Sequence, residues 1–291
     1  MLVEGENITR WKRGLVEILA YFINVCEENN LRYYCWGGTA IGAVRHHGII
    51  PWDDDVDVMM PRPDYNKLIG VLKSKIDEDY EIVEPYTCDM YYLTYAKLCK
   101  KNTTILEVEH LPFIQGLYID IFPIDGCSDD YNQYLKEFDA YHKLRVELML
   151  VSSKYSFKYI LRQILRLHIK RAFQIMYFYA HREECRKRIL EGLKLFEDNH
   201  VYGSTQHVAV FSGYCRNKEQ VPEIWLGEGT TFEFENLEVV LPKCFDEHLS
   251  HFFGDYMQFP PKEQQVTHHS LAYFNLERRV SMDEILTYIK K

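Results

Sequence analysis

One stretch of the chain, residues 33–63, restricts both its fold and its chemistry more than any other. It reads YYCWGGTAIGAVRHHGIIPWDDDVDVMMPRP, and near its end acidic and apolar residues alternate from Asp55 to Val58. Successive side chains of a strand point to opposite faces, so the alternation predicts a strand with Asp55 and Asp57 on one face and valines in the core. Two carboxylates about 7 Å apart on one face repel each other by roughly 2 kcal/mol at an effective dielectric near 20. A divalent cation such as Mg²⁺, which takes oxygen ligands, is the simplest compensation.

A third acid lies in a later apolar run. Residues 117–124, LYIDIFPI, are typical of a strand, and Asp120 stands between two isoleucines. Burying a carboxylate without a partner is costly. We therefore expect Asp120 to share the cation with Asp55 and Asp57.

A glycine-rich turn precedes the acids. Gly37, Gly38 and Thr39 follow a short predicted strand, and Thr39 is a suitable N-cap for a helix over residues 40–46. The backbone N–H groups of such a turn and helix N-terminus can bind a phosphate. The turn and the acids together indicate chemistry on a phosphate group.

Composition narrows the class of protein. A chain of 291 residues with 47% hydrophobic and 26% charged residues suits one large soluble domain or two moderate ones. Its formal charge of −9 argues against a nucleic-acid partner. None of its eight cysteines forms a CxxC pair, which favours reduced thiols over a zinc cluster. Without an apolar leader or a run of about 18 apolar residues, the expected location is cytoplasmic.

The order of predicted elements indicates an α/β (α+β) fold. It has a nucleotidyltransferase-like mixed sheet core with flanking helices and an added helical region. The expected domains are a catalytic core over 1–128, a basic helical region over 129–200, and a C-terminal segment over 201–291 that completes the site. Predicted helices cover 8–30, 64–76, most of 129–196, and 243–253; strands cover 31–36, 80–85, 91–99, 103–109 and 231–241, with a hairpin turn at 100–102.

The helical region carries an unusual charge pattern. Between Glu147 and Glu183 there are seven basic residues and no acidic one. Five of them are spaced four apart, which predicts a basic stripe on one helix: Lys154, Lys158, Arg162, Arg166 and Lys170. Peripheral contact of residues 154–182 with an anionic membrane is one interpretation. Two other interpretations of this segment are equally open: a helix that covers the catalytic core, or a patch that binds an anionic glycan.

Several familiar sites do not match the acidic stretch. Valine alternation disfavours a solvated loop. An EF-hand starting at Asp53 would need Gly and Glu where the chain has Val58 and Asp64. The sequence GGTAIG matches neither a P-loop nor a dinucleotide-binding fingerprint. A glycosidase site is disfavoured because its two catalytic acids usually come from separate elements. Phosphoryl or nucleotidyl transfer remains, in which two metal ions activate the nucleophile and stabilise the leaving oxygen.

A GG turn followed by D-x-D and a later acid in a strand resembles the nucleotidyltransferase (DNA polymerase β-like) superfamily. More closely, CWGGTAIGAVRHHGIIPWDDDVDVMMPRPDY resembles the LicD family of lipopolysaccharide and teichoic-acid cholinephosphotransferases, to which fukutin-type proteins are distantly similar. The resemblance continues in YAKL at 95–98, YIDIFPID at 118–125 and FGDYM at 253–257. It implies that Asp55, Asp57 and Asp120 bind Mg²⁺ or Mn²⁺, with Asp53 and Asp54 orienting them.

The resemblance also implies a substrate pair. The donor would be CDP-choline, from which phosphocholine passes to a sugar hydroxyl on a glycan or glycolipid while CMP leaves; phosphoethanolamine and ribitol phosphate are related cargoes. Asp120 is the candidate that assists deprotonation of the hydroxyl. The expected substrate-binding residues are Gly37, Gly38, Thr39, Arg45, His46, Lys97, His268 and His269. Tyr91, Tyr92 and Tyr256 are candidates to face the choline group.

Two other classes of function stay open. One is a nucleotidyltransferase that leaves a nucleotide on a small molecule or protein. The other is a non-catalytic module that binds a glycan or nucleotide.

Overall fold

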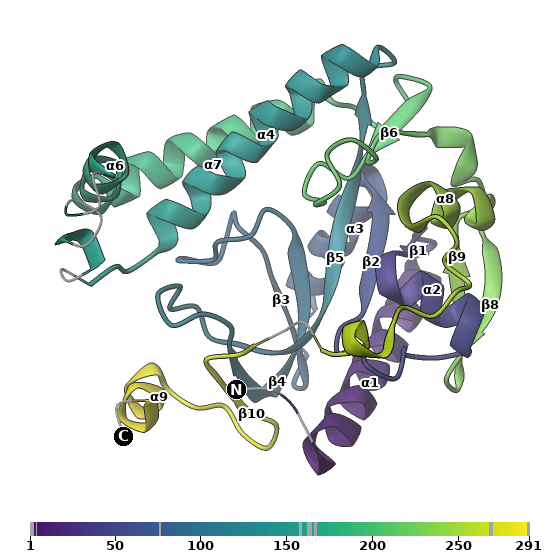
Figure 1. The fold of residues 1–291 in the computed structure, drawn as a ribbon, viewed down its shortest axis with the longest axis horizontal. Helices are drawn as coiled ribbons and strands as arrows, with labels where there is room; N and C mark the ends of the chain where they lie inside the picture. Colours follow the sequence, from purple (N-terminus) through teal and green to yellow (C-terminus); the bar gives the residue numbers. More distant parts are fainter. Residues whose placement is uncertain are drawn as a thin grey trace.

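The computed structural model describes residues 3, 5–75, 77–156, 159–161, 165, 168–267 and 270–289. They form a mixed sheet with helices on its flanks and a small separate hairpin, which confirms the predicted α/β (α+β) class (Figure 1). The helices are α1 (Glu6–Asn29), α2 (Gly37–His46), α3 (Arg62–Ser74), α4 (Tyr131–Ser152), α6 (Ile169–Ala180), α7 (Arg182–Asn199), α8 (Phe245–Phe253) and α9 (Met282–Ile289). The strands are β1 (Tyr34–Cys35), β2 (Asp57–Pro61), β3 (Tyr80–Val83), β4 (Ala96–Leu106), β5 (Gln115–Cys127), β6 (His207–Ala209), β7 (Val221–Pro222), β8 (Thr230–Phe234), β9 (Leu237–Leu241) and β10 (Tyr273–Asn275).

The sheet has a parallel pair at its centre. Its main path runs β1-β2-β5-β4-β10, and β2 and β5 are parallel while their other neighbours are antiparallel. Asp57 of β2 stands beside Asp120 of β5, and Lys97 of β4 stands beside Asp120 on the other side. Neighbouring residues in register share a face of a sheet, so these three side chains form one row.

Helix α1 covers the opposite face. Leu117, Ile119 and Ile121 of β5 belong to the hydrophobic core that α1 helps to form. The approach is close at Gly14, where a Cβ atom would lie 2.4 Å from a methyl carbon of Leu117. Because side chains alternate along a strand, burying these residues under α1 turns Asp120 to the other face.

The helical region forms a second core. Helices α4 and α7 lie side by side, and α6 crosses their far end (Figure 1). Arg186 of α7 donates hydrogen bonds to the backbone carbonyls of Pro85, Cys88 and Tyr91. These hydrogen bonds connect the helical region to the loop that leads into β4.

The hairpin turn predicted at residues 100–102 is wrong. β4 runs from Ala96 to Leu106 with an irregularity in its pairing to β5 between Lys100 and Ile105. Thr103 explains this: its hydroxyl donates to the Lys100 carbonyl at 2.7 Å and accepts from the Leu117 N–H at 2.7 Å. The Thr103 hydroxyl thus replaces backbone hydrogen bonds that are missing at the irregularity. The strand therefore continues through it, as strands do at a β-bulge.

Two further predictions need correction. Strand β2 begins at Asp57, so Asp55 belongs to the irregular segment before it; the Trp11 indole donates to the Asp54 carbonyl at 2.7 Å and holds that segment. Lys154 lies outside the helices and Lys170 belongs to α6, so the basic residues do not form a stripe on one helix. Lys158, Arg162 and Arg166 lie outside the described residues. Among the described helices, none is long and apolar enough to cross a membrane.

Candidate active site

The start of β2 is fixed by two neighbouring elements. The Asp57 N–H donates to the Thr39 hydroxyl at 2.9 Å, and the Asp57 carbonyl accepts from the Trp36 N–H at 3.0 Å. On the other side, the Asp120 N–H donates to the Val56 carbonyl at 2.9 Å. These bonds hold Asp57 between the first turn of α2 and strand β5.

Helix α2 begins earlier than predicted, at Gly37 rather than after Thr39. The Thr39 hydroxyl is therefore available to Asp57 and does not cap the helix. A Cβ atom at Gly37 would lie 3.4 Å from Asp57 Oδ2, and one at Gly38 would lie only 2.3 Å from Asp53 Oδ2. Glycine at position 38 lets a carboxylate approach the first turn, where N–H groups lack partners within the helix and favour anions.

Five acids gather at this point, and we call them the acidic cluster: Asp53, Asp54, Asp55, Asp57 and Asp120. Carboxylate oxygens of Asp53, Asp54 and Asp55 lie within 4.8 Å of one another. Asp53 also shares a hydrogen bond with Asp55. Loop 53–56 thus supplies three acids, and the two adjacent strands supply one each.

Crowding changes the protonation of the cluster. Burial, followed by the charge of Asp55, raises the pKa of Asp53 to about 8. Burial also raises the pKa of Asp57 well above its usual value, and the charges of Asp55, Asp120 and Asp53 add to this. Carboxyl groups that hold protons near neutral pH because of burial and like charges are typical of functional sites.

The chemistry of the cluster fits a hard divalent cation. Its ligand atoms are carboxylate oxygens, which Mg²⁺ and Mn²⁺ prefer over nitrogen or sulfur. A bound cation would offset the repulsion that raises the pKa values of Asp53 and Asp57. The ligand set Asp55, Asp57 and Asp120 stays a prediction, since oxygens of Asp53 and Asp54 also lie within 4.8 Å of an oxygen of Asp55.

Lys97 lies beside Asp120 in the interior. Its side chain is 2% exposed, and its Nζ lies 3.2 Å from Asp120 Oδ1 and 2.8 Å from Glu107 Oε1. Burial alone would lower the pKa of Lys97, but the charges of Asp120 and Glu107 outweigh it and raise that pKa. Lys97 is thus held charged next to the cluster. Its predicted contact with donor phosphates stays a prediction.

Glu107 is the residue that sequence reasoning missed. It accepts hydrogen bonds from the hydroxyls of Tyr92 and Tyr118 as well as from Lys97. Burial alone would raise its pKa, but Lys97 and the two hydroxyls lower it to about 2. A signal existed, because a lysine inside the apolar strand YAKLC requires an acidic partner.

Arg45 and His46 lie at the other end of α2, about 12 Å along the helix from Gly37 by its rise per residue. Arg45 Nη1 donates to the carbonyls of Tyr256 at 2.6 Å and Gln258 at 2.9 Å. His46 packs against Trp52 and Phe259. Both side chains contact the segment after α8, and their predicted roles toward the donor stay predictions.

The remaining candidate residues are two histidines and three tyrosines. His268 and His269 lie outside the described residues. Tyr91 is buried and donates to the Tyr95 carbonyl at 3.0 Å, and Tyr92 donates to Glu107. Tyr256 donates to Asp246 Oδ1 at 2.6 Å. All three tyrosines are engaged within the protein.

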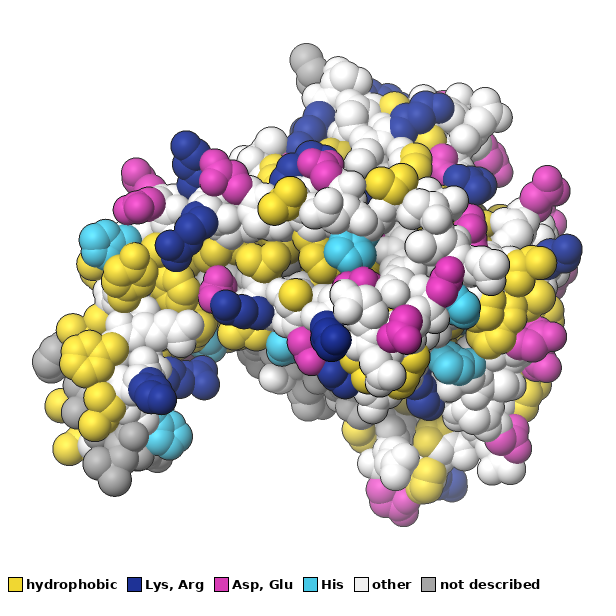
Figure 2. All heavy atoms as spheres, turned by 90° about the horizontal axis from the view of Figure 1, so that it is seen from above, with side chains coloured by type: hydrophobic (Ala, Val, Ile, Leu, Met, Phe, Trp, Pro, Cys, Tyr) yellow, Lys and Arg dark blue, Asp and Glu magenta, His cyan; other side chains and the backbone are white. Residues whose placement is uncertain are grey.

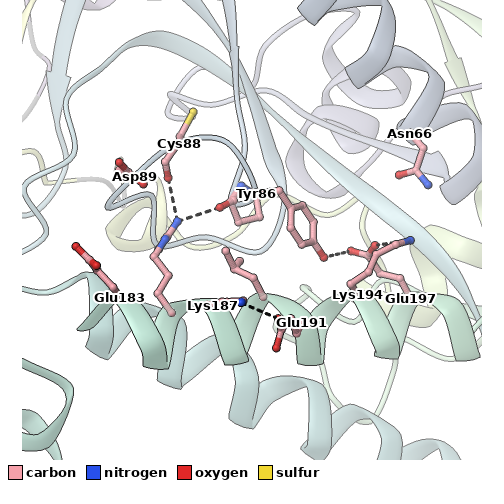
Figure 3. Close-up of a pocket in the computed structure, with 12 residues that line it drawn as sticks. Asn66, Tyr86, Cys88, Asp89, Glu183, Lys187, Glu191, Lys194 and Glu197 are labelled. Atoms are coloured by element: carbon pink, nitrogen blue, oxygen red, sulfur yellow. Dashed lines mark hydrogen bonds and ion pairs between the residues drawn. The ribbon is translucent and has the colours of Figure 1, made fainter. Parts of the chain in front are cut away.

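A hollow of about 660 Å³ lies elsewhere, between α7 and the loop at residues 85–89 (Figure 3). Tyr86 donates to Glu197 at 2.8 Å across it, and Lys187 pairs with Glu191 along its helical wall. None of the predicted site residues that the structure describes lines it. The hollow is therefore separate from the acidic cluster.

Comparison with known proteins identifies relatives of this chain. Residues 30–158 match the family model described as LicD/FKTN/FKRP, nucleotidyltransferase domain, and this range contains the whole acidic cluster, Lys97 and Glu107. The chain is also 28% identical over 262 residues to the lipopolysaccharide cholinephosphotransferase LicD of Haemophilus influenzae, covering 87% of this chain and 92% of that protein. The chain is therefore similar to the LicD family over residues 30–158 and to one LicD protein over most of its length.

Other relatives match shorter stretches of the chain. The ribitol 5-phosphate transferase FKRP of Homo sapiens is 48% identical over 46 residues, which are 16% of this chain and 9% of that protein. An uncharacterized protein of Rickettsia typhi is 51% identical over 111 residues, which are 38% of this chain and 34% of that protein. The resemblance inferred from the sequence motifs is confirmed.

Proposed function

We propose that this protein is a phosphotransferase that moves phosphocholine, or a related phospho-alcohol, from a CDP-activated donor to a hydroxyl of a cell-surface glycan or glycolipid. The observation that carries the proposal is the acidic cluster beside the first turn of α2, inside the matched LicD domain. The name of the Haemophilus influenzae relative supports phosphocholine and lipopolysaccharide. The name of FKRP keeps ribitol phosphate open.

In this proposal, Asp55, Asp57 and Asp120 would hold Mg²⁺ or Mn²⁺, with Asp53 and Asp54 close by. When bound, the cation would neutralise phosphate charge in the donor and on the departing CMP. The unpaired N–H groups at Gly37, Gly38 and Thr39 would bind a donor phosphate oxygen. This arrangement would hold the donor between the helix N-terminus and the carboxylates.

Asp120 would accept the proton of the acceptor hydroxyl as the phosphorus–oxygen bond to CMP breaks. Its position at the edge of the cluster suits this role, because Lys97 Nζ lies 3.2 Å from its Oδ1. Glu107 in turn holds Lys97 at 2.8 Å. The lysine charge would favour the ionised form of Asp120 before each turnover.

The test is CMP release from CDP-choline, CDP-ethanolamine and CDP-ribitol, with a cell-envelope glycan extract and with Mg²⁺, Mn²⁺ or EDTA. We expect metal-dependent release that Asp55→Asn abolishes and that the exposed control Asp283→Asn leaves unchanged. The mass of the acceptor should rise by one phospho-alcohol group. A gain of a nucleoside monophosphate would identify a nucleotidyltransferase instead, and full turnover by Asp55→Asn would overturn the proposed site.

A further inference from the structure

Helix α6 presents an apolar face to solvent. Ala172, Ile175 and Phe178 point inward and are buried against α4 and α7. The exposed side carries an apolar stripe at helical spacing: Ile169 is 46% exposed, Phe173 66%, Met176 48% and Tyr177 49%. A surface helix of a soluble protein usually turns polar residues outward, so this helix is apolar on both sides. Contiguous exposed apolar groups of this kind mark an interaction surface.

Basic residues accompany the stripe. Lys170 and Arg171 are exposed on the first turn of α6, and Lys154 is exposed shortly before it. The sequence from residue 148 to residue 182 contains no acidic residue, although the whole chain has a formal charge of −9. The positive charge is thus concentrated where the apolar side chains are exposed. An anionic partner is complementary to this combination.

The position of α6 suits a broad surface better than a small ligand. The helix lies at the outer end of α4 and α7, on the side of the molecule away from α8 and the β8–β9 hairpin (Figure 1). Figure 2 shows hydrophobic and basic side chains together on the end of the molecule that projects to the left. A projecting helix with apolar and basic groups can approach a planar partner without the sheet intervening.

We propose that α6 docks the enzyme on an anionic lipid bilayer. Ile169, Phe173 and Met176 enter the boundary between headgroups and acyl chains, roughly 5–10 Å deep for helices of this kind. Lys170 and Arg171 contact lipid phosphates at the surface. This goes beyond the proposed reaction, because it assigns the enzyme a place at the membrane surface.

The experiment is co-sedimentation of the full-length protein with vesicles of phosphatidylcholine alone or mixed with phosphatidylglycerol. We expect binding to the mixed vesicles, weak binding to the neutral ones, and a decline as salt rises. Lys170→Gln/Arg171→Gln should weaken binding on the order of tenfold, and Phe173→Asn/Met176→Gln should weaken it at least as much. The control Lys136→Gln/Lys143→Gln removes two exposed charges from α4 and should bind as the wild type does.

Three results would overturn membrane docking. The first is no sedimentation with either vesicle. The second is binding that both α6 variants retain while their circular dichroism and melting match the wild type. The third is a dimer, seen by light scattering, that Phe173→Asn/Met176→Gln dissociates, since that would assign the apolar face to a second copy of the chain.

Discussion

Strands β2 and β5 run side by side from the acidic cluster to a second group of buried charges. At the second group, Arg62 Nε and Nη2 donate to the two oxygens of Asp125 at 2.6 and 2.7 Å, and Nη1 lies 3.3 Å from Glu197. At the acidic cluster, Lys97 is the cation beside Asp120, but it also forms an ion pair with Glu107. The parallel pairing of β2 and β5 thus starts at the crowded acids Asp57 and Asp120 and stops just before the paired charges of Arg62 and Asp125.

The pKa values reflect this difference. Burial would lower the pKa of Arg62, but Asp125 and Glu197 outweigh it and raise the pKa. In the cluster, burial and repulsion act together on Asp57 and raise its pKa. A buried ion pair with complete hydrogen bonding is costly to break and serves the fold. Crowded acids cost stability until something binds to them, which is typical of a site kept for function.

The largest expected difference between the two regions is in activity. Asp57→Asn should lower donor turnover on the order of 10³-fold, because it removes a charge that the proposed cation requires. It should leave the metal-free protein as stable as the wild type or more stable, since repulsion in the cluster falls. CMP release and thermal unfolding measured on the same preparation check both parts. Unfolding of Asp57→Asn would show that the cluster serves the fold.

Breaking the paired region should have the opposite result. Arg62→Met should lower the free energy of unfolding by about 3 kcal/mol, since it leaves Asp125 buried without its partner. Urea denaturation followed by circular dichroism measures this loss. Turnover per folded molecule should change far less than in Asp57→Asn. The double variant Arg62→Met/Asp125→Leu should recover part of the stability; no recovery would argue against the pair as the cause.

The smallest expected effect is a pH dependence of stability. The raised pKa of Asp53, about 8, means that the folded state binds more protons than the unfolded state between about pH 4 and pH 8. The free energy of unfolding in EDTA should therefore fall as pH rises through this window, on the order of 1–2 kcal/mol after screening. Melting curves from pH 5 to 8.5 test this. Asp53→Asn should flatten the profile and Mg²⁺ should oppose the fall, whereas an identical slope in Asp53→Asn would exclude Asp53 as its source.

Local patterns predicted much of the site. The cost of burying a lone carboxylate in LYIDIFPI predicted that Asp120 lies near Asp57, and the structure sets the two residues in register. The position of Asp55 was predicted less well, because tertiary bonds such as that from Trp11 to the Asp54 carbonyl hold this segment out of the strand. Periodicity describes a segment by itself and does not include such bonds.

The main features that the sequence did not predict are contacts between residues that lie far apart along the chain. Arg62 and Asp125 are 63 residues apart, and Glu107 reaches Lys97 only because β4 continues past Lys100. That continuation depends on Thr103 bonding to Leu117 of the next strand. The close approach of Asp53 to Gly38 likewise follows from how loop 53–56 packs on α2. These features arise from packing between elements, and no single stretch encodes them.

Two strands cover the outer edge of β4, and the ribosome synthesises them at different times. Strand β3 pairs with Lys97–Lys100 and precedes β4 in the chain, but β10 pairs with Thr104–Leu106 and is made about 170 residues later. At 5–20 residues per second, a ribosome needs roughly 10–30 seconds to deliver it. During that interval the backbone of Thr104–Leu106 is open to strands of other nascent chains. Slow translation would therefore lengthen the period in which this protein is most prone to aggregate.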